Sequence, residues 1–341
     1  MYWYQKKGNE KDVVVSTRVR LARNLADYPF EGRLTPAKAE EIIRKVTSLF
    51  EKEAGYEIRN MADLSHLQAL SLCERHYISP EFAEKSTPRA LITQNERDTA
   101  LMVCEEDHLR IQCIKNGLAI EDAYVGATEI DDLLDEHLEY AYDEKLGYLT
   151  HCPTNLGTAM RVSVMMFLPA ITMAGQIEPL KLQLQKIGLA VRGLYGEGSD
   201  ASGCLYQISN QVTLGITEEG TLKKVREIVS QIAEQERRLR QSVQGAAFYK
   251  LIDRASRAEG VFRHARLLSS EEFLKLYADL RLGLSLEENG HLTYEMLDSL
   301  LFEAMPATVS IGTKSEEGTQ DLPEEYKRDL ARARTVAAAL A

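Results

Sequence analysis

The chain has 341 residues, of which 44% are hydrophobic and 27% charged, so it can form a large core in one or two domains. Its formal net charge of −11 at pH 7 disfavours a general surface for nucleic acid or anionic membranes. Five cysteines, an odd number without regular disulfide spacing, predict reduced thiols in a cytoplasmic protein. The N-terminus lacks a signal-peptide core, and the longest apolar run, residues 162–175, is too short to span a bilayer.

The first half of the chain mixes predicted helices and strands. Thr35 followed by Pro36 is typical of a helix N-cap with proline at the first helical position. We therefore expect a helix over residues 37–54 that ends near Gly55. A second helix is predicted over residues 130–142. Short β-prone runs predict strands at residues 90–93, 99–104 and 108–114.

A glycine-rich loop interrupts the next pair of predicted strands. Residues 189–192 and 205–209 are β-prone, and residues 193–203 between them hold four glycines. This composition is typical of a tightly turned or mobile connection.

The remainder of the chain reads as almost entirely helical. Residues 221–244 form a long amphipathic pattern, with apolar residues every three or four positions. The sequence therefore predicts an α+β domain over residues 1–220 and a helical C-terminal domain over residues 221–341.

Arginines recur beside turn residues and carboxylates in four short blocks of the sequence. Arginine is the preferred side chain for a two-pronged contact with phosphate oxygens, so these blocks predict a local positive site in an acidic protein. No P-loop or eukaryotic protein-kinase motif is present, and the glycines of the loop do not fit a dinucleotide fingerprint. An arginine clamp for a polyphosphate, next to an acid or base, is what remains. The blocks are residues 16–23 (STRVRLAR), 104–110 (CEEDHLR), 152–161 (CPTNLGTAMR) and 191–197 (VRGLYGE).

These blocks, in this order, resemble the signature blocks of the phosphagen (guanidino) kinases, over about residues 12–220. The resemblance implies a catalytic domain built on an antiparallel sheet flanked by helices. It also implies transfer of the γ-phosphoryl of MgATP, with Mg²⁺ held mainly through the nucleotide phosphates. Little chain precedes the first block, and residues 221–341 are foreign to creatine and arginine kinases. In both features the chain resembles the bacterial protein arginine kinases. This resemblance implies that the phosphoryl group is transferred to arginine side chains of proteins, and that the modified proteins undergo regulated degradation.

The resemblance implies nucleotide contacts at matching positions. His76 matches an adenine-contacting histidine, Met165 stands where arginine kinases often carry a second one, and Thr213 stands where creatine kinases carry an arginine. The arginines that match the family's phosphate ligands are Arg18, Arg20, Arg110, Arg161 and Arg192.

Four further residues match the guanidinium side of the reaction. Glu106, next to Glu105, matches the catalytic carboxylate, Glu197 matches a loop glutamate that grips the guanidinium, and Cys152 matches the reactive cysteine beside it. A guanidinium is a weak nucleophile because its lone pairs are delocalised, so a carboxylate that holds it and accepts a proton is needed. Taken singly, such an arginine is more often a surface ion-pair partner, and such a cysteine a buried inert thiol.

The C-terminal region carries Arg328, Asp329 and Arg332 with helical spacing. By charge alone they suggest an exposed helical face with an ion pair. The protein arginine kinases are known for an Arg-Asp-x-x-Arg motif that forms a regulatory phosphoarginine pocket, which the resemblance implies here. It further implies a homodimer or larger oligomer, an activator protein, the Clp degradation machinery and a role in stress responses.

Two alternatives to a protein arginine kinase remain open at the level of sequence. The chain could phosphorylate free arginine or another small guanidine, or it could be a non-catalytic adaptor that binds phosphoarginine. Cys73 with His76, and Cys104 with His108, have ligand-like spacing, but each pair is incomplete and no protein-held metal is expected.

Overall fold

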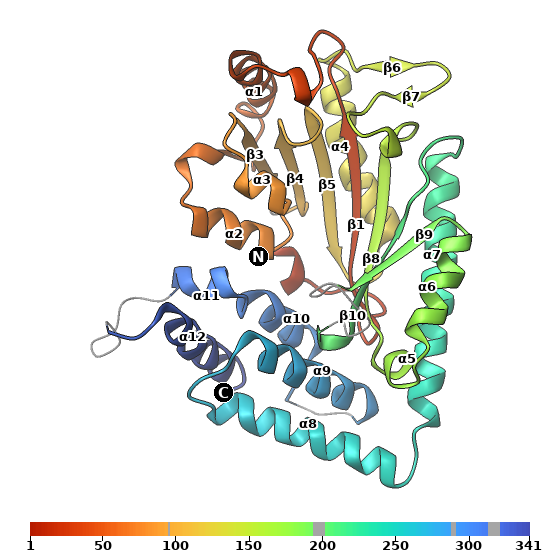
Figure 1. The fold of residues 1–341 in the computed structure, drawn as a ribbon, viewed down its shortest axis with the longest axis vertical. Helices are drawn as coiled ribbons and strands as arrows, with labels where there is room; N and C mark the ends of the chain where they lie inside the picture. Colours follow the sequence, from red (N-terminus) through yellow and green to blue (C-terminus); the bar gives the residue numbers. More distant parts are fainter. Residues whose placement is uncertain (95, 194–201, 288–290, 313–320) are drawn as a thin grey trace.

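The computed structural model describes residues 1–94, 96–193, 202–287, 291–312 and 321–341. Within them, eight strands form one sheet in the order β2-β3-β4-β5-β1-β8-β10-β9, and every neighbouring pair is antiparallel. A two-stranded ribbon, β6 with β7, projects beyond the end of the sheet (Figure 1). The strands are β1 (Val14–Arg23), β2 (Glu57–Asn60), β3 (Ala90–Gln94), β4 (Thr99–Val103), β5 (Leu109–Asn116), β6 (Tyr142–Asp143), β7 (Gly147–Tyr148), β8 (Met160–Phe167), β9 (Leu189–Gly193) and β10 (Leu205–Asn210).

One face of the sheet is covered by four helices and forms the first core. These helices present apolar residues at helical spacing, as Ile42 and Val46 do, and the strands present every second residue, as Val19 and Leu21 do. Two short helices, α2 (His66–Glu74) and α3 (Pro80–Glu84), lie on the other side, and α5 (Pro169–Met173) lies at one end. The four covering helices are α1 (Pro36–Phe50), α4 (Ile120–Asp135), α6 (Ile177–Lys186) and α7 (Glu218–Ser242).

The C-terminal helices form a layer below one end of the sheet (Figure 1). They build a second core with the opposite sheet face, to which β8 contributes Met165 and Phe167. The N-terminal turn joins this core, because Trp3 packs edge-on against Phe302 with ring centroids 4.7 Å apart. The helices are α8 (Ala246–His264), α9 (Ser270–Leu286), α10 (Tyr294–Glu303), α11 (Pro306–Gly312) and α12 (Glu324–Ala339).

Most predicted elements are confirmed. Thr35 caps α1 by accepting a hydrogen bond from the backbone N–H of Lys38, and the expected strands appear as β3, β4, β5, β9 and β10. The helix predicted over residues 130–142 is wrong, because α4 spans Ile120–Asp135. Ala119 at its N-cap offers no capping side chain, so the sequence gives no start signal there.

Helix α7 bears on the domain boundary, which the sequence analysis placed at residue 220, before this helix. Its apolar residues, among them Val225 and Val229, belong to the first core, which they share with the sheet. We propose that the boundary is better drawn after Ser242, at the connection to α8. Within the described residues, no helix is long and apolar enough to cross a membrane.

Candidate active site

The five predicted phosphate arginines share one face of the sheet. Arg20 of β1 lies directly opposite Arg161 of β8, and its partner on β5 is Gln112, two residues from Arg110. Cross-strand partners point to the same face, as do residues two apart on one strand. The same rule places Arg18 beside Arg20, and places Arg192 of β9 on this face through the pairing of Ala190 with Ser209 and of Ser209 with Ser163. Strand pairing therefore gathers residues from 18 to 192 into one positive surface.

The charge of this surface is not balanced by neighbouring carboxylates. Among the described residues, no ion pair within 4.0 Å involves Arg18, Arg20, Arg161 or Arg192, whereas Arg110 pairs with Glu105. The Nε atoms of Arg20 and Arg161 are buried without a hydrogen-bond partner in the described part of the chain. Unpaired buried donors of this kind suit a multiply charged anion.

Burial and mutual repulsion lower the pKa values of these arginines. Burial, followed by the charges of Arg110 and Arg161, lowers the pKa of Arg18 to about 10. Burial and the neighbouring arginines lower the pKa of Arg20 well below its ordinary value. Burial and the charges of Arg192 and Arg110 lower that of Arg161. An anion bound at this face would relieve the repulsion.

The two adjacent glutamates have opposite electrostatic environments. Burial would raise the pKa of Glu105, but the charge of Arg110, aided by a 2.5 Å hydrogen bond from the Ser79 hydroxyl, lowers it overall. Burial and then the charge of Asp107 raise the pKa of Glu106. Glu105 is thus held as an ionised anchor, and Glu106 has the raised basicity that suits a proton acceptor.

Both glutamates open into a pocket of about 730 Å³. Glu31, Glu81 and Glu84 also line it. None of the three was predicted from the sequence, because each looks like an ordinary solvated residue in a helix or turn. Arg110 lines the same pocket and so joins it to the arginine face. The pocket is completed by Lys85, Glu105, Glu106 and His151.

Cys152 stands on the loop beside this pocket, next to its lining residue His151. Its Sγ lies 3.0 Å from the Thr154 hydroxyl, and it is half-buried. The Thr213 hydroxyl fixes the loop by donating to the carbonyls of Leu156, at 2.7 Å, and of Thr154, at 3.0 Å. The role of Thr213 in the described structure is therefore to hold this loop in place.

Gly157 allows the loop to approach the main chain of Thr213 closely enough for these hydrogen bonds to form. Its φ is +106°, and a Cβ at this position would overlap the Thr213 carbonyl. Any side chain at residue 157 would displace the loop that carries Cys152.

His76 lies at the junction of the arginine face and the C-terminal helices. Its ring stacks on Trp3, with centroids 6.3 Å apart, and meets Phe302 of α10 edge-on at 5.3 Å. Burial and the charge of Arg18 lower its pKa to about 3, so the ring is neutral. Met165 is buried in the second core. The expected contact of His76 with adenine stays a prediction.

The C-terminal motif is only partly accessible. Arg332 is 1% exposed and donates to the carbonyls of Leu268 and Ala304, at 2.6 and 2.8 Å. It also donates to Asp329 at 2.7 Å, whereas Arg328 is half-buried.

Glu197 lies outside the described residues. Among those described, no group of three or more His, Cys, Asp or Glu side chains is placed to hold a metal ion.

Two family models match the chain. One, described as the ATP:guanido phosphotransferase C-terminal catalytic domain, covers residues 38–239. The other, described as the protein-arginine kinase McsB C-terminal domain, covers residues 249–341.

Full-length relatives and solved structures agree with these matches. A protein-arginine kinase of Pelotomaculum thermopropionicum is 39% identical over 97% of this chain and 93% of its own. A protein-arginine kinase of Caldanaerobacter subterraneus is 41% identical over 97% of this chain and 98% of its own. A duplicated taurocyamine kinase from Schistosoma mansoni with bound transition-state-analogue components has a TM-score of 0.61 at 22% identity, and the match covers 74% of this chain and 39% of that one.

A lombricine kinase structure has a TM-score of 0.60 at 22% identity over 70% of both chains. At this identity the solved structures show the fold alone, which is the guanidino phosphotransferase fold expected from the sequence. With the family models and the full-length relatives taken together, the chain belongs to the ATP:guanido phosphotransferases and, within that family of phosphotransferase enzymes, to the protein-arginine kinases.

Proposed function

We propose that the protein transfers the γ-phosphoryl group of MgATP to the guanidinium of arginine residues in other proteins. One observation carries the proposal: a sheet face of five arginines adjoins a pocket lined by five glutamates, and Arg110 is common to both. Only Arg110 among the five has a carboxylate partner within the described residues. A polyphosphate and a guanidinium, brought together, require this pairing of opposite charges.

The arginine face is suited to the nucleotide. Phosphoryl transfer depends on alignment and charge neutralisation more than on covalent help from the protein. The unpaired Nε atoms of Arg20 and Arg161 would donate to phosphate oxygens. Mg²⁺ would enter on the nucleotide phosphates and add to the neutralisation there.

The glutamate pocket is suited to the acceptor. Glu106 would hold the guanidinium and accept the proton that its nitrogen loses when it bonds to the γ-phosphorus, while ADP leaves. Its raised pKa supports this role. Glu105, fixed by Arg110 and Ser79, would complete the anionic wall, and Glu197 is proposed as a further contact. The Cys152 thiol would add a further polar group beside the guanidinium.

The test is phosphate incorporation from ATP into either an unfolded protein or free arginine, read as acid-labile phosphate. We expect protein phosphorylation, and a loss of about 10²- to 10⁴-fold in Glu106→Gln with nearly unchanged ATP affinity. Glu144→Gln, at an exposed turn, is the matched control. Turnover by Glu106→Gln at the wild-type rate would exclude the proposed base. Phosphorylation of free arginine alone would indicate a small-guanidine kinase, and none at all would indicate an adaptor.

We also propose that the C-terminal region regulates the enzyme through a phosphoarginine site that includes Arg328, Asp329 and Arg332. The family match of residues 249–341 supports this. A titration with free phosphoarginine tests it: Asp329→Ala should bind more weakly than wild type, because a guanidinium needs a carboxylate. Equal binding would exclude the site and leave the kinase assignment intact.

The wider context is proposed on the same family relationship. The modified arginines would mark proteins for regulated degradation by the Clp machinery during stress. The enzyme would act in the cytoplasm as a homodimer or larger oligomer, with an activator protein.

A further inference from the structure

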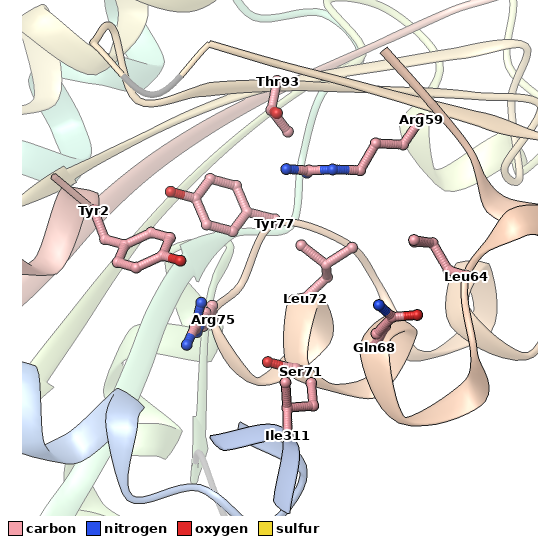
Figure 2. A pocket seen from close by; sticks show the side chains of 10 residues that line it. All are labelled: Tyr2, Arg59, Leu64, Gln68, Ser71, Leu72, Arg75, Tyr77, Thr93 and Ile311. Atoms are coloured by element: carbon pink, nitrogen blue, oxygen red, sulfur yellow. The ribbon is translucent and has the colours of Figure 1, made fainter. Parts of the chain in front are cut away.

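A second pocket, of about 210 Å³, lies between the sheet edge, α2 and the C-terminal helix α11. Figure 2 shows it from close by, and Figure 1 places the N-terminus between the same two helices. It shares no lining residue with the glutamate pocket of the candidate active site. Its lining residues are Tyr2, Arg59, Leu64, Gln68, Ser71, Leu72, Arg75, Tyr77, Thr93 and Ile311.

The charge that lines this pocket is positive. Two of the ten lining residues are arginines, and none is acidic. Arg59 pairs with Glu57 and Arg75 with Glu303, but neither carboxylate lines the pocket. The guanidinium of Arg59 extends across the cavity towards Thr93 and Tyr77 (Figure 2). An anion is therefore favoured over a cation.

Three of the lining residues carry buried polar groups without hydrogen-bond partners in the described part of the chain. Tyr77 and Thr93 are each 3% exposed, and their hydroxyls have no hydrogen-bond partner among the described residues. The Nε of Arg75 is likewise buried without a hydrogen-bond partner among the described residues. Buried polar groups are nearly always paired, so three unpaired ones around one cavity indicate an occupant that accepts hydrogen bonds.

The remainder of the lining is apolar or aromatic. Leu64, Leu72 and Ile311 contribute aliphatic surface, and the Tyr2 ring lies with its centroid 4.5 Å from the guanidinium carbon of Arg75. Such a wall suits the body of an organic molecule rather than a bare ion.

We propose that this pocket binds a small organic oxyanion, with a carboxylate or phosphate head on an aromatic or aliphatic body. The two arginines and the two buried hydroxyls hold the head, and the aliphatic wall holds the body. Phosphoarginine is disfavoured here, because its guanidinium would face two arginines with no lining carboxylate to meet it. The occupant bridges the sheet edge and α11, and so links the catalytic and C-terminal parts of the chain.

The test is calorimetric titration of the full-length protein with phenyl phosphate and with benzoate, in the presence of saturating non-hydrolysable ATP analogue to fill the arginine face. Benzyl alcohol is the uncharged control. We expect saturable binding of at least one anion and none of the alcohol, and the stronger anion identifies the head group.

Variants locate the binding. Arg59→Gln should weaken it at least about tenfold, because a charge-assisted hydrogen bond is lost. Tyr77→Phe removes a hydroxyl without a partner, so it should weaken binding several-fold while leaving the melting temperature equal or higher. Arg97→Gln, at an exposed arginine that pairs with Glu129 and does not line the pocket, is the matched control and should bind like wild type. Absence of saturable binding at millimolar anion, or equal affinity in wild type and both pocket variants, would overturn the proposal.

Discussion

Two arginines of β1, three residues apart, should respond in opposite ways to the same substitution. Arg20 faces Arg161 across the strands and has a buried Nε without a partner. Arg23, 1% exposed, pairs with Asp131 at 2.6 Å and lies 3.5 Å from the centre of the Tyr148 ring. Methionine retains the apolar length of either side chain and removes the charge.

Arg20→Met should stabilise the nucleotide-free protein by about 1 kcal/mol, because like charges opposite one another on neighbouring strands destabilise by about 0.2–1 kcal/mol per pair. It should also raise the Kd for ATP about 10- to 150-fold, the equivalent of a lost charge-assisted contact of about 1.5–3 kcal/mol. Arg23→Met should lower the free energy of unfolding by about 3–5 kcal/mol, because it leaves Asp131 as a buried charge without its partner.

Thermal unfolding with and without nucleotide, together with calorimetric ATP binding, measures both effects. Folded Arg23→Met should bind ATP with near wild-type affinity. The reasoning would be refuted if Arg20→Met lost as much stability as Arg23→Met while binding ATP normally, since the arginine face would then be structural.

Three further outcomes are expected. The pKa of Glu106 is raised, and its ionised form accepts the proton, so kcat/KM should fall as pH drops through a value above the ordinary glutamate pKa of about 4.3; an acidic limb at or below that value would contradict the role. Cys152→Ser should be strongly impaired, and alkylation of Cys152 should inactivate the enzyme unless substrates protect it; full activity after alkylation would make the thiol dispensable. Arg332→Ala should lower the melting temperature, because two buried carbonyls lose their donor, whereas Arg328→Ala should leave it nearly unchanged; equal melting of both variants would show that these buried contacts add little.

The amino-acid sequence determined the features that depend on local patterns. The Thr35-Pro36 cap and the apolar spacing that follows specify α1, since both signals act within a few residues. Alternation within β1 already separates Arg18 and Arg20 from Val19 and Leu21. The order of the arginine and glutamate blocks carried the family resemblance, which the family models and relatives confirm.

The tertiary structure alone decided what depends on the pairing of distant segments. The register of β1 with β8 sets Arg20 against Arg161, and no pattern in either segment encodes that pairing. Likewise, Glu81 and Glu84 line the glutamate pocket only because α3 lies beside the strand end that carries Glu105 and Glu106.

The start of α4 and the packing partner of α7 could not be predicted from the sequence, and the cause is the same for both. Helix α4 begins without a capping side chain, so its start is set by packing on β1 and β5. Helix α7 has the amphipathic pattern of any surface helix, and only its contacts with the sheet assign it to the first core. The C-terminal motif is a third case, because its spacing gave no sign that Arg332 would be buried against main-chain carbonyls. Sequence periodicity specifies which face of an element is apolar, and the tertiary structure specifies what that face meets.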